Sequence, residues 1–107
     1  NGNYKSDVSS ARTFGFEKDV KELIANGFAI GGSLENAIVI GGHSILNKEG
    51  LRFKDEFVRH KILDLIGDLY LAGYPVEGYF HGKKSGHSLN KALLKKLLSN
   101  KENFKLI

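Results

Sequence analysis

The sequence predicts an α+β fold in which two main helices pack on a mostly antiparallel sheet. Two long segments, near residues 53–72 and 88–98, have apolar residues at helical spacing. Two short segments beside glycines, 37–40 and 43–46, look like strands. The chain has 107 residues, 41% hydrophobic and 26% charged, which suits one small domain with a modest core.

The first half of the chain is expected to contain a strand, a helix and a hairpin. Residues 11–16 predict a short strand or an extended segment. Residues 16–26 predict a helix that stops at Gly27, a residue type that commonly follows the last helical turn. Gly41 and Gly42 join the two short segments at 37–40 and 43–46, and such a pair is a hairpin signal.

The second half is expected to contain the two main helices and one more strand. The first long helix should end before Gly73 and Pro75, because neither residue continues a helix well. Residues 76–82 alternate between apolar and polar and predict a strand. Ser88 or Asn90 is expected to cap the last helix. The buried side of that helix should carry five leucines: Leu89, Leu93, Leu94, Leu97 and Leu98.

The first long helix carries His60, Asp64 and Asp68 at intervals of four residues. Side chains four residues apart stack along one face of a helix. One interpretation is an ordinary solvated face, which the spacing alone favours. The other is a metal site, because a His and an Asp one turn apart can bind one ion. The two aspartates repel each other unless a cation lies nearby. The opposite, apolar side consists of Val58, Ile62, Leu65, Ile66 and Leu69.

Positive charge is concentrated at the end of the chain. Residues 1–80 have a balance of −2 and residues 81–107 a balance of +6, within a total of +4. Such an end favours anionic partners, although lysines on a terminal helix also simply keep it in solution. Lys83 and Lys84 precede the last helix, whose first N–H groups suit an anion. His87 could act there as an acid if a carboxylate such as Asp68 lies close.

Several features bound the class of protein. The chain has no Cys, which excludes disulfides and thiolate metal sites. No apolar run approaches the roughly 20 residues that cross a bilayer, so we expect no transmembrane segment, and no signal peptide is visible. The chain begins Asn-Gly-Asn and contains no Met, so we expect a fragment or a processed product.

Six sequence blocks stand in order within residues 11–100: Ala11-Arg-Thr-Phe-Gly-Phe16, Gly31-Gly-Ser33, Asn47-Lys-Glu-Gly-Leu-Arg-Phe53, Glu56-Phe-Val-Arg-His-Lys-Ile-Leu-Asp64, Gly67-Asp-Leu-Tyr-Leu71 and Lys84-Ser-Gly-His-Ser-Leu-Asn90. Together they resemble the C-terminal part of the UDP-3-O-acyl-N-acetylglucosamine deacetylase family, the zinc amidases of lipid A synthesis in Gram-negative bacteria. The resemblance implies an incomplete second domain of a two-domain enzyme. It suggests a flexible lead-in at 1–10 and a partial C-terminal catalytic domain at 11–107. A helix-plus-hairpin insert would occupy about 15–46.

The resemblance also implies individual roles. His60 and Asp64 match two ligands of a Zn²⁺ cofactor. Asp68 matches the aspartate that orients His87, and His87 matches the histidine that stabilises the oxyanion or protonates the leaving amine. Lys61 matches a lysine of the catalytic site that contacts the substrate beside the metal. The other matched positions are Lys84 near the diphosphate of the UDP-linked acylated glucosamine, Thr13 and Phe14 at the sugar, and Val20, Ala29, Gly32, Ser33, Ala37 and Val39 along a passage for the acyl chain.

One part of the family pattern has no match in this chain. The family takes its third zinc histidine and its general-base glutamate from an N-terminal domain. We therefore expect that missing domain to be a partner, and this chain alone to bind zinc weakly without turnover. No specific nucleic acid is expected on this hypothesis. The alternative hypothesis is a non-catalytic basic module that binds anionic lipid or nucleic acid through the Lys-rich last helix.

Overall fold

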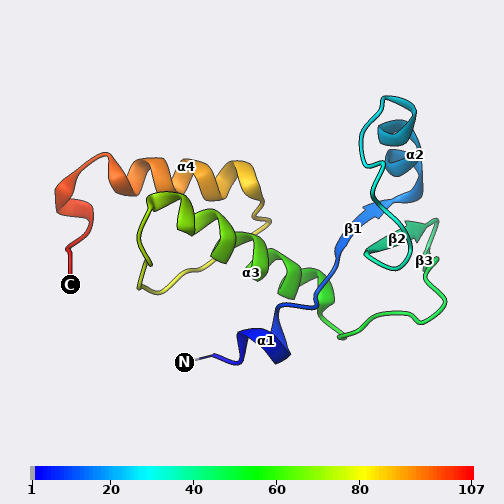
Figure 1. Cartoon of the computed structure of the whole chain (residues 1–107), viewed down its shortest axis with the longest axis horizontal. Helices are drawn as coiled ribbons and strands as arrows, with labels where there is room; N and C mark the ends of the chain where they lie inside the picture. The colour runs from blue at the N-terminus through cyan, green and yellow to red at the C-terminus, as the bar shows by residue number, and fades with distance from the viewer. Residues whose placement is uncertain (1) are drawn as a thin grey trace. The chain divides into compact units, whose positions relative to one another are not determined.

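The structure is a computed structural model that describes residues 2–107. Asn1, the first residue of the expected lead-in, lies outside the described residues. The chain divides into two compact units, the first ending at His60 and the second running from Lys61 to Ile107. The elements labelled in Figure 1 are α1 (Tyr4–Asp7), β1 (Thr13–Phe16), α2 (Glu17–Ala25), β2 (Ala37–Gly41), β3 (Ser44–Ile45), α3 (Glu56–Leu69) and α4 (His87–Leu98). Two short 3₁₀ turns follow the last two helices, η1 (Tyr70–Ala72) and η2 (Lys101–Asn103).

The sheet of the first unit has the order β1-β2-β3 and is mixed. β1 and β2 are parallel, with Thr13 opposite Ala37, whereas β2 and β3 are antiparallel, with Ile40 opposite Ile45. The α+β class is confirmed, but the parallel pair departs from the mostly antiparallel sheet that was predicted. The reason is the connection: α2 joins β1 to β2 and packs on both, and a strand that returns through a helix runs in the same direction as the first.

The predicted hairpin is confirmed at β2 and β3. Gly42 has φ +60°, a conformation that glycine adopts without steric cost. A Cβ atom on Gly41 would come within 2.8 Å of the exposed Leu46 side chain, so a larger residue there would require that side chain to shift. The buried side chain of Asn47 fixes the outgoing chain, because its amide donates to the backbone oxygens of Leu34 and Ala37 at 2.7 and 2.8 Å.

Residues 4–7 form α1, a single helical turn that the polar composition of the lead-in did not predict. The Asp7 N–H donates to the Asn3 oxygen at 2.7 Å. Arg59, in the part of α3 that belongs to the first unit, donates from Nη1 to the Asp7 oxygen at 2.9 Å. This contact joins residues far apart in the chain, so local sequence patterns do not indicate it.

The first predicted long helix is confirmed as α3 and η1, although the helix begins at Glu56 and not near residue 53. It ends before Gly73, which has φ +83° and so accepts the left-handed conformation that stops a helix. Leu69 on its apolar side is buried, but Val58 and Ile62 on the same side are exposed.

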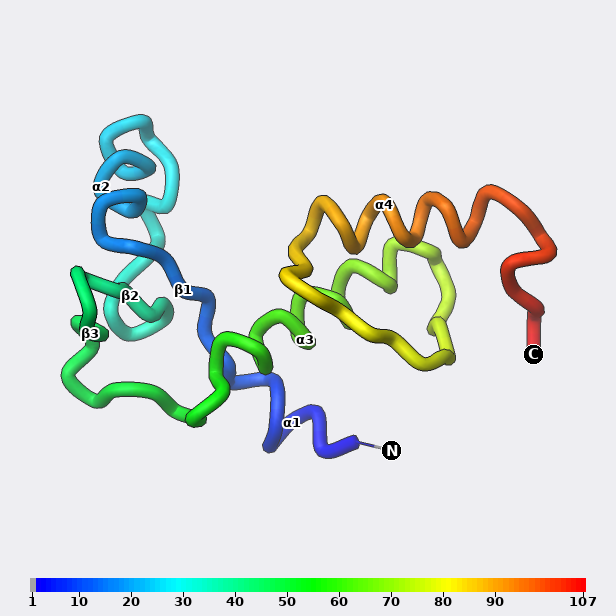
Figure 2. Tube along the Cα trace, turned by 180° about the vertical axis from the view of Figure 1, so that it is seen from behind, coloured from blue at the N-terminus to red at the C-terminus, as the bar shows by residue number. Residues whose placement is uncertain are grey.

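In the second unit, α4 runs beside the later turns of α3, as Figures 1 and 2 show. The expected cap was wrong: Gly86 is the N-cap residue, and α4 begins at His87, before Ser88. The Asn90 N–H bonds the Gly86 oxygen at 2.9 Å, as the first turn of a helix requires. The Asn90 side chain instead contacts α3, as described below.

Two further predictions for the second unit were wrong. Residues 76–82 form no strand, and among the described residues they have no ladder partner, which alternation alone cannot supply. Of the five leucines expected on the buried side of α4, Leu94 is buried, whereas three are exposed. The physical reason is an open groove of about 1080 Å³ that α4 shares with segment 74–83 and the chain end. The three exposed leucines are Leu89, Leu93 and Leu98.

Within the described part of the chain, no helix combines the length and the apolar character that a bilayer crossing demands.

Candidate active site

A cluster of polar side chains lies between α3 and α4 in the second unit. His87, at the first position of α4, has its Nδ1 atom 2.7 Å from Oδ2 of Asp68 on α3. Asn90, one turn further along α4, donates from Nδ2 to the same Oδ2 at 3.0 Å. The other ring nitrogen of His87, Nε2, lies 3.8 Å from Oδ1 of Asp64. The cluster therefore joins an imidazole to two carboxylates.

Burial and charge distinguish the members of this cluster. The side chains of Asp64 and Asp68 are only 17% and 13% exposed, whereas that of His87 is 62% exposed. Burial alone would raise the pKa of Asp68, but the hydrogen bonds from Asn90 and His87 outweigh it and the pKa lies below its usual value. Asp68 is thus a carboxylate near neutral pH. The interpretation of this stripe as an ordinary solvated face does not fit such burial.

Asn90 was missed as a site residue because it was interpreted as a helix cap. Its side chain is buried and is turned toward α3. The available signal was its spacing: Asn90 follows His87 by three residues, so the two side chains share a face of α4. A buried amide on the face of a candidate catalytic histidine is a sign of a supporting role.

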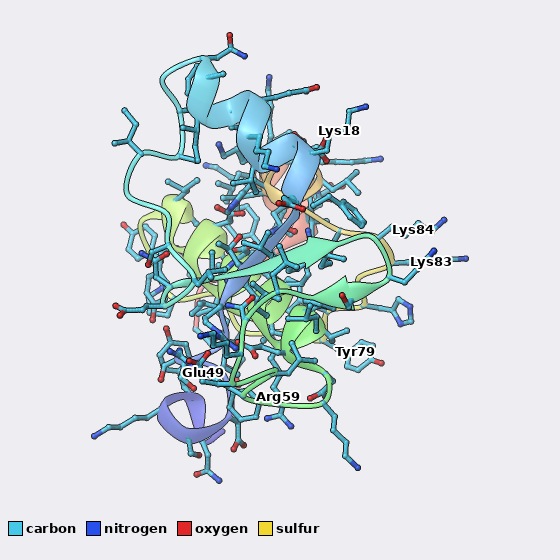
Figure 3. All side chains as sticks on the ribbon, turned by 90° about the vertical axis from the view of Figure 1, so that its right-hand side faces the viewer. Lys18, Glu49, Arg59, Tyr79, Lys83 and Lys84 are labelled. Atoms are coloured by element: carbon cyan, nitrogen blue, oxygen red, sulfur yellow. The ribbon has the colours of Figure 1, made fainter. Side chains whose placement is uncertain are left out.

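The expected lysines lie on α3 and on the loop before α4. The Nζ atom of Lys61 is 3.8 Å from the position that a Cβ on Gly86 would take, so this lysine reaches the loop. Lys84 has φ +50°, which is uncommon for a residue other than glycine. Figure 3 shows Lys83 and Lys84 extending from this loop in the same direction, and both are exposed. An anion at this loop would meet both ammonium groups.

His60, in the first unit, is held by the backbone just before β1. Its Nδ1 atom lies 2.9 Å from the carbonyl oxygen of Ala11. A carbonyl oxygen only accepts, so Nδ1 carries the hydrogen of this bond. In the neutral imidazole the lone pair then lies on Nε2, which is the usual arrangement of a histidine that binds a metal ion.

A buried ion pair lies one turn before His60 on α3. The Glu56 side chain is 0% exposed and lies 2.9 Å from Nε of Arg12. Burial would raise the pKa of Glu56, but hydrogen bonds from the side chain and backbone of Arg12 and from the backbone of Arg52 lower it to about 2. The same pair raises the pKa of Arg12. Both groups are therefore charged across the ordinary pH range.

The expected sugar and acyl-chain residues lie in the first unit, on β1, α2, β2 and the loop between them. Register places Thr13 opposite Ala37 and Gly15 opposite Val39. A Cβ on Gly15 would come within 3.2 Å of the Val20 side chain, so Val20 of α2 lies against β1. Phe14 contacts Phe57 with ring centroids 4.5 Å apart. Three further expected residues lie in the exposed α2–β2 loop: Ala29, Gly32 and Ser33.

The expected metal ligands both lie on α3, with His60 one turn before Asp64. Among residues 2–107, no group of three or more His, Cys, Asp or Glu side chains is arranged to hold a metal ion. Two ligands on one helix are half of the usual tetrahedral set for zinc.

Comparison with known proteins identifies the family of the chain. Residues 1–99 match the family model described as LpxC, UDP-3-O-acyl N-acetylglycosamine deacetylase. The chain belongs to this deacetylase family.

Individual relatives carry the same family name. The UDP-3-O-acyl-N-acetylglucosamine deacetylase of Psychrobacter arcticus is 56% identical over 105 residues, which are 98% of this chain and 33% of the relative. Those of Haemophilus influenzae and Pasteurella multocida are 57% and 55% identical over 100 and 104 residues, covering 94% and 97% of this chain and 33% and 34% of the relatives. The chain thus spans about a third of the length of the relatives that it matches.

Proposed function

We propose that this chain supplies part of the active site of a zinc-dependent deacetylase that hydrolyses the acetamide of UDP-3-O-acyl-N-acetylglucosamine in lipid A synthesis. The observation that carries the proposal is the pair of His87 and Asp68, with Nδ1 and Oδ2 2.7 Å apart. Membership of the deacetylase family supports the reaction class. The proposal includes a cytoplasmic location, which the resemblance to this family implies.

His87 is the proton donor of the proposed reaction. Hydrolysis joins a water oxygen to the carbonyl carbon and breaks the C–N bond, and the departing amine then needs a proton. Asp68 accepts the Nδ1–H of His87 and stabilises the imidazolium form, so that Nε2 can give its proton to the amine nitrogen. The exposed position of His87 allows this nitrogen to reach a substrate. While His87 is protonated, its charge also favours the developing oxyanion.

His60 and Asp64 are the proposed zinc ligands of this chain. Their chemistry fits, because a neutral imidazole and a carboxylate are common zinc donors, and the bond to Ala11 leaves the His60 lone pair on Nε2. A zinc ion bound there would act as a Lewis acid that polarises the amide carbonyl and lowers the pKa of the water bound to it. The third ligand and the general base would come from the rest of a longer protein. This chain alone is therefore expected to bind zinc weakly and to lack turnover.

Residues of both units are proposed to bind the substrate. Lys84 and Lys61 are cations that suit a nucleotide diphosphate and the reacting group near the metal. Thr13 and Phe14 would contact the sugar. The small residues on α2, β2 and their loop would form the wall of the acyl passage, because side chains of this size leave room for an alkyl chain.

A chimera tests the proposal. This chain replaces the corresponding third of the Psychrobacter arcticus relative, and deacetylation is measured with and without a chelator. We expect activity that a chelator removes and zinc restores, and that falls about 100-fold or more with His87→Ala. Activity that persists in the chelator, or that survives His87→Ala, would overturn the proposal.

The alternative is a basic module, and its support is the exposure of Lys91, Lys95 and Lys96 on α4. Binding of this chain to anionic vesicles or to nucleic acid should then fall steeply with salt. It should also persist after His60→Ala and Asp64→Ala. Absence of such binding removes this alternative.

A further inference from the structure

The environment of His60 contains a support that no assigned role explains. His60 donates from Nδ1 to the Ala11 oxygen, as described above. That oxygen belongs to the peptide group between Ala11 and Arg12. The N–H of the same peptide group, that of Arg12, donates to Oε2 of Glu56 at 2.9 Å. A peptide group is planar and trans, so its C=O and N–H point in opposite directions. One rigid peptide is therefore held at one side by His60 and at the other by Glu56.

Glu56 and His60 are four residues apart on α3, so their side chains lie on one face, one turn from each other. The peptide before β1 thus bridges two successive turns of the helix. Displacement of this peptide would move the acceptor of the His60 hydrogen bond. The orientation of the imidazole therefore depends on how firmly Glu56 is fixed.

Glu56 is fixed by more bonds than a simple ion pair provides. Its Oε2 also accepts from Nε of Arg12 at 2.9 Å, and its Oε1 accepts from Nη2 of Arg12 at 3.1 Å and from the Arg52 N–H at 2.7 Å. Nη2 of Arg12 donates in addition to the Gly50 oxygen at 3.0 Å. The two-pronged contact between a guanidinium and a carboxylate sets direction as well as distance. Two loops and the start of α3 are held together at this carboxylate.

We propose that Glu56 and Arg12 are positioning residues for His60, which fix the Ala11 carbonyl so that it selects the Nδ1–H tautomer and directs Nε2 toward a metal ion. The metal part of this inference rests on the proposed function, whereas the tautomer part does not. Neither residue touches the substrate or the metal in this account.

A purely structural role for the pair makes different predictions. If Glu56 and Arg12 only join the start of β1 to α3, their loss would lower stability without changing the tautomer of a His60 that remains folded. The measurement that separates the two explanations is which ring nitrogen of His60 carries the hydrogen. It is made on variants that circular dichroism shows to be folded.

The first experiment uses long-range ¹H–¹⁵N correlation spectra of the metal-free chain, with His60 assigned through His60→Ala. We expect the Nδ1–H tautomer of His60 in the wild-type chain. Glu56→Gln should shift it toward the mixture of tautomers found in solvent, and Arg12→Lys should do so to a smaller extent, because the backbone N–H to Glu56 remains. The matched control is Asp55→Asn, which breaks an exposed ion pair with Arg59 at the same end of α3. This control variant should leave the tautomer of His60 unchanged.

The second experiment measures the affinity of the metal-free chimera for zinc alone. Glu56→Gln should weaken zinc binding about 10-fold or more, the usual effect of removing a residue that orients a ligand, while Asp55→Asn should not. A wild-type His60 that carries its hydrogen on Nε2 overturns the inference, as does a folded Glu56→Gln chain with unchanged tautomer and zinc affinity. If the wild-type chimera binds no zinc, the proposed function fails, and the spectra still decide whether Glu56 positions His60. If Glu56→Gln does not fold, the inference is tested by the spectra of the wild type and Arg12→Lys. It then requires the Nδ1–H tautomer in the wild type and a smaller fraction of it in Arg12→Lys.

Discussion

His60 in the first unit and His87 in the second are both held through Nδ1, but by partners of different charge. His60 donates to the neutral carbonyl of Ala11, whereas His87 faces the carboxylate of Asp68. A neutral acceptor fixes the tautomer of the ring without adding a charge beside Nδ1, which suits a metal ligand. A carboxylate stabilises the imidazolium, which suits a proton donor. The charge of the group that Nδ1 contacts thus distinguishes the histidine proposed as a metal ligand from the histidine proposed as a proton donor.

The supports behind the two partners also differ. The Ala11 carbonyl is fixed indirectly, through a peptide group that a buried ion pair holds. Asp68 is fixed directly, by the amide of Asn90. Disruption of the first support should therefore affect folding most, and disruption of the second should affect catalysis more than folding.

The largest expected effect follows removal of Glu56. Glu56→Ala leaves the buried guanidinium of Arg12 without its partner, so we expect a loss of about 3–5 kcal/mol in the free energy of unfolding. Urea denaturation of the chain measures this loss. Asp55→Ala, which removes an exposed ion pair with Arg59 at the start of α3, should change stability little. If both variants lost the same free energy of unfolding, the buried ion pair of Arg12 and Glu56 would not contribute more than the exposed pair, contrary to this prediction.

The pH dependence of stability should report on the same ion pair. The pKa of Glu56 is about 2 in the folded chain against 4.5 for an ordinary glutamate, a difference of about 3 kcal/mol. Because the folded pKa is the lower one, this stabilisation is complete above about pH 4.5 and is lost as the pH falls toward 2. Denaturation across this window should show a steeper fall for the wild type than for Glu56→Gln. Parallel curves would refute the assignment.

Removal of the carboxylate in the second unit should lower catalysis in the chimera. Asp68→Asn keeps the shape of the side chain but removes its charge, so we expect kcat to fall about 100-fold. The His60 tautomer should stay as in the wild type, since Ala11 and Glu56 are unchanged. A variant that keeps more than half of the wild-type kcat would show that His87 does not depend on Asp68.

The smallest expected effect follows loss of Asn90. Asn90→Ala removes one neutral donor to Oδ2 of Asp68, so kcat should fall about 2- to 10-fold with little change in KM. A matched control is Ser88→Ala, at an exposed position of the same helical turn. If both variants behave alike, Asn90 has no special part in holding Asp68.

The sequence predicted those features that depend on neighbouring residues. Apolar periodicity and glycines predicted α2, the end of α3 near Gly73 and the hairpin at Gly42, because local geometry decides them, whereas the start of α3 lies at Glu56 and not near residue 53. The strand expected at 76–82 failed because a strand needs a partner, and alternation carries no information about one. The parallel pairing of β1 and β2 follows from the α2 crossover, not from the composition of the strands.

The candidate site shows the same limit. The four-residue spacing indicated that His60, Asp64 and Asp68 share a face of α3, and the resemblance paired His87 with Asp68. The parts played by Arg12, Glu56 and Asn90 depend on contacts across 44 and 22 residues of chain. Such contacts form only after the elements have packed, so no local pattern reveals them.

The roles proposed for His60 and His87 are tested most directly by one long-range ¹H–¹⁵N correlation spectrum of the metal-free chain near neutral pH, in which both residues are assigned. The account predicts that neutral rings of both residues carry their hydrogen on Nδ1, one toward the Ala11 carbonyl and the other toward the Asp68 carboxylate. A hydrogen on Nε2 of either ring would mean that its lone pair faces the supporting group and not the site of the reaction, and would contradict the account.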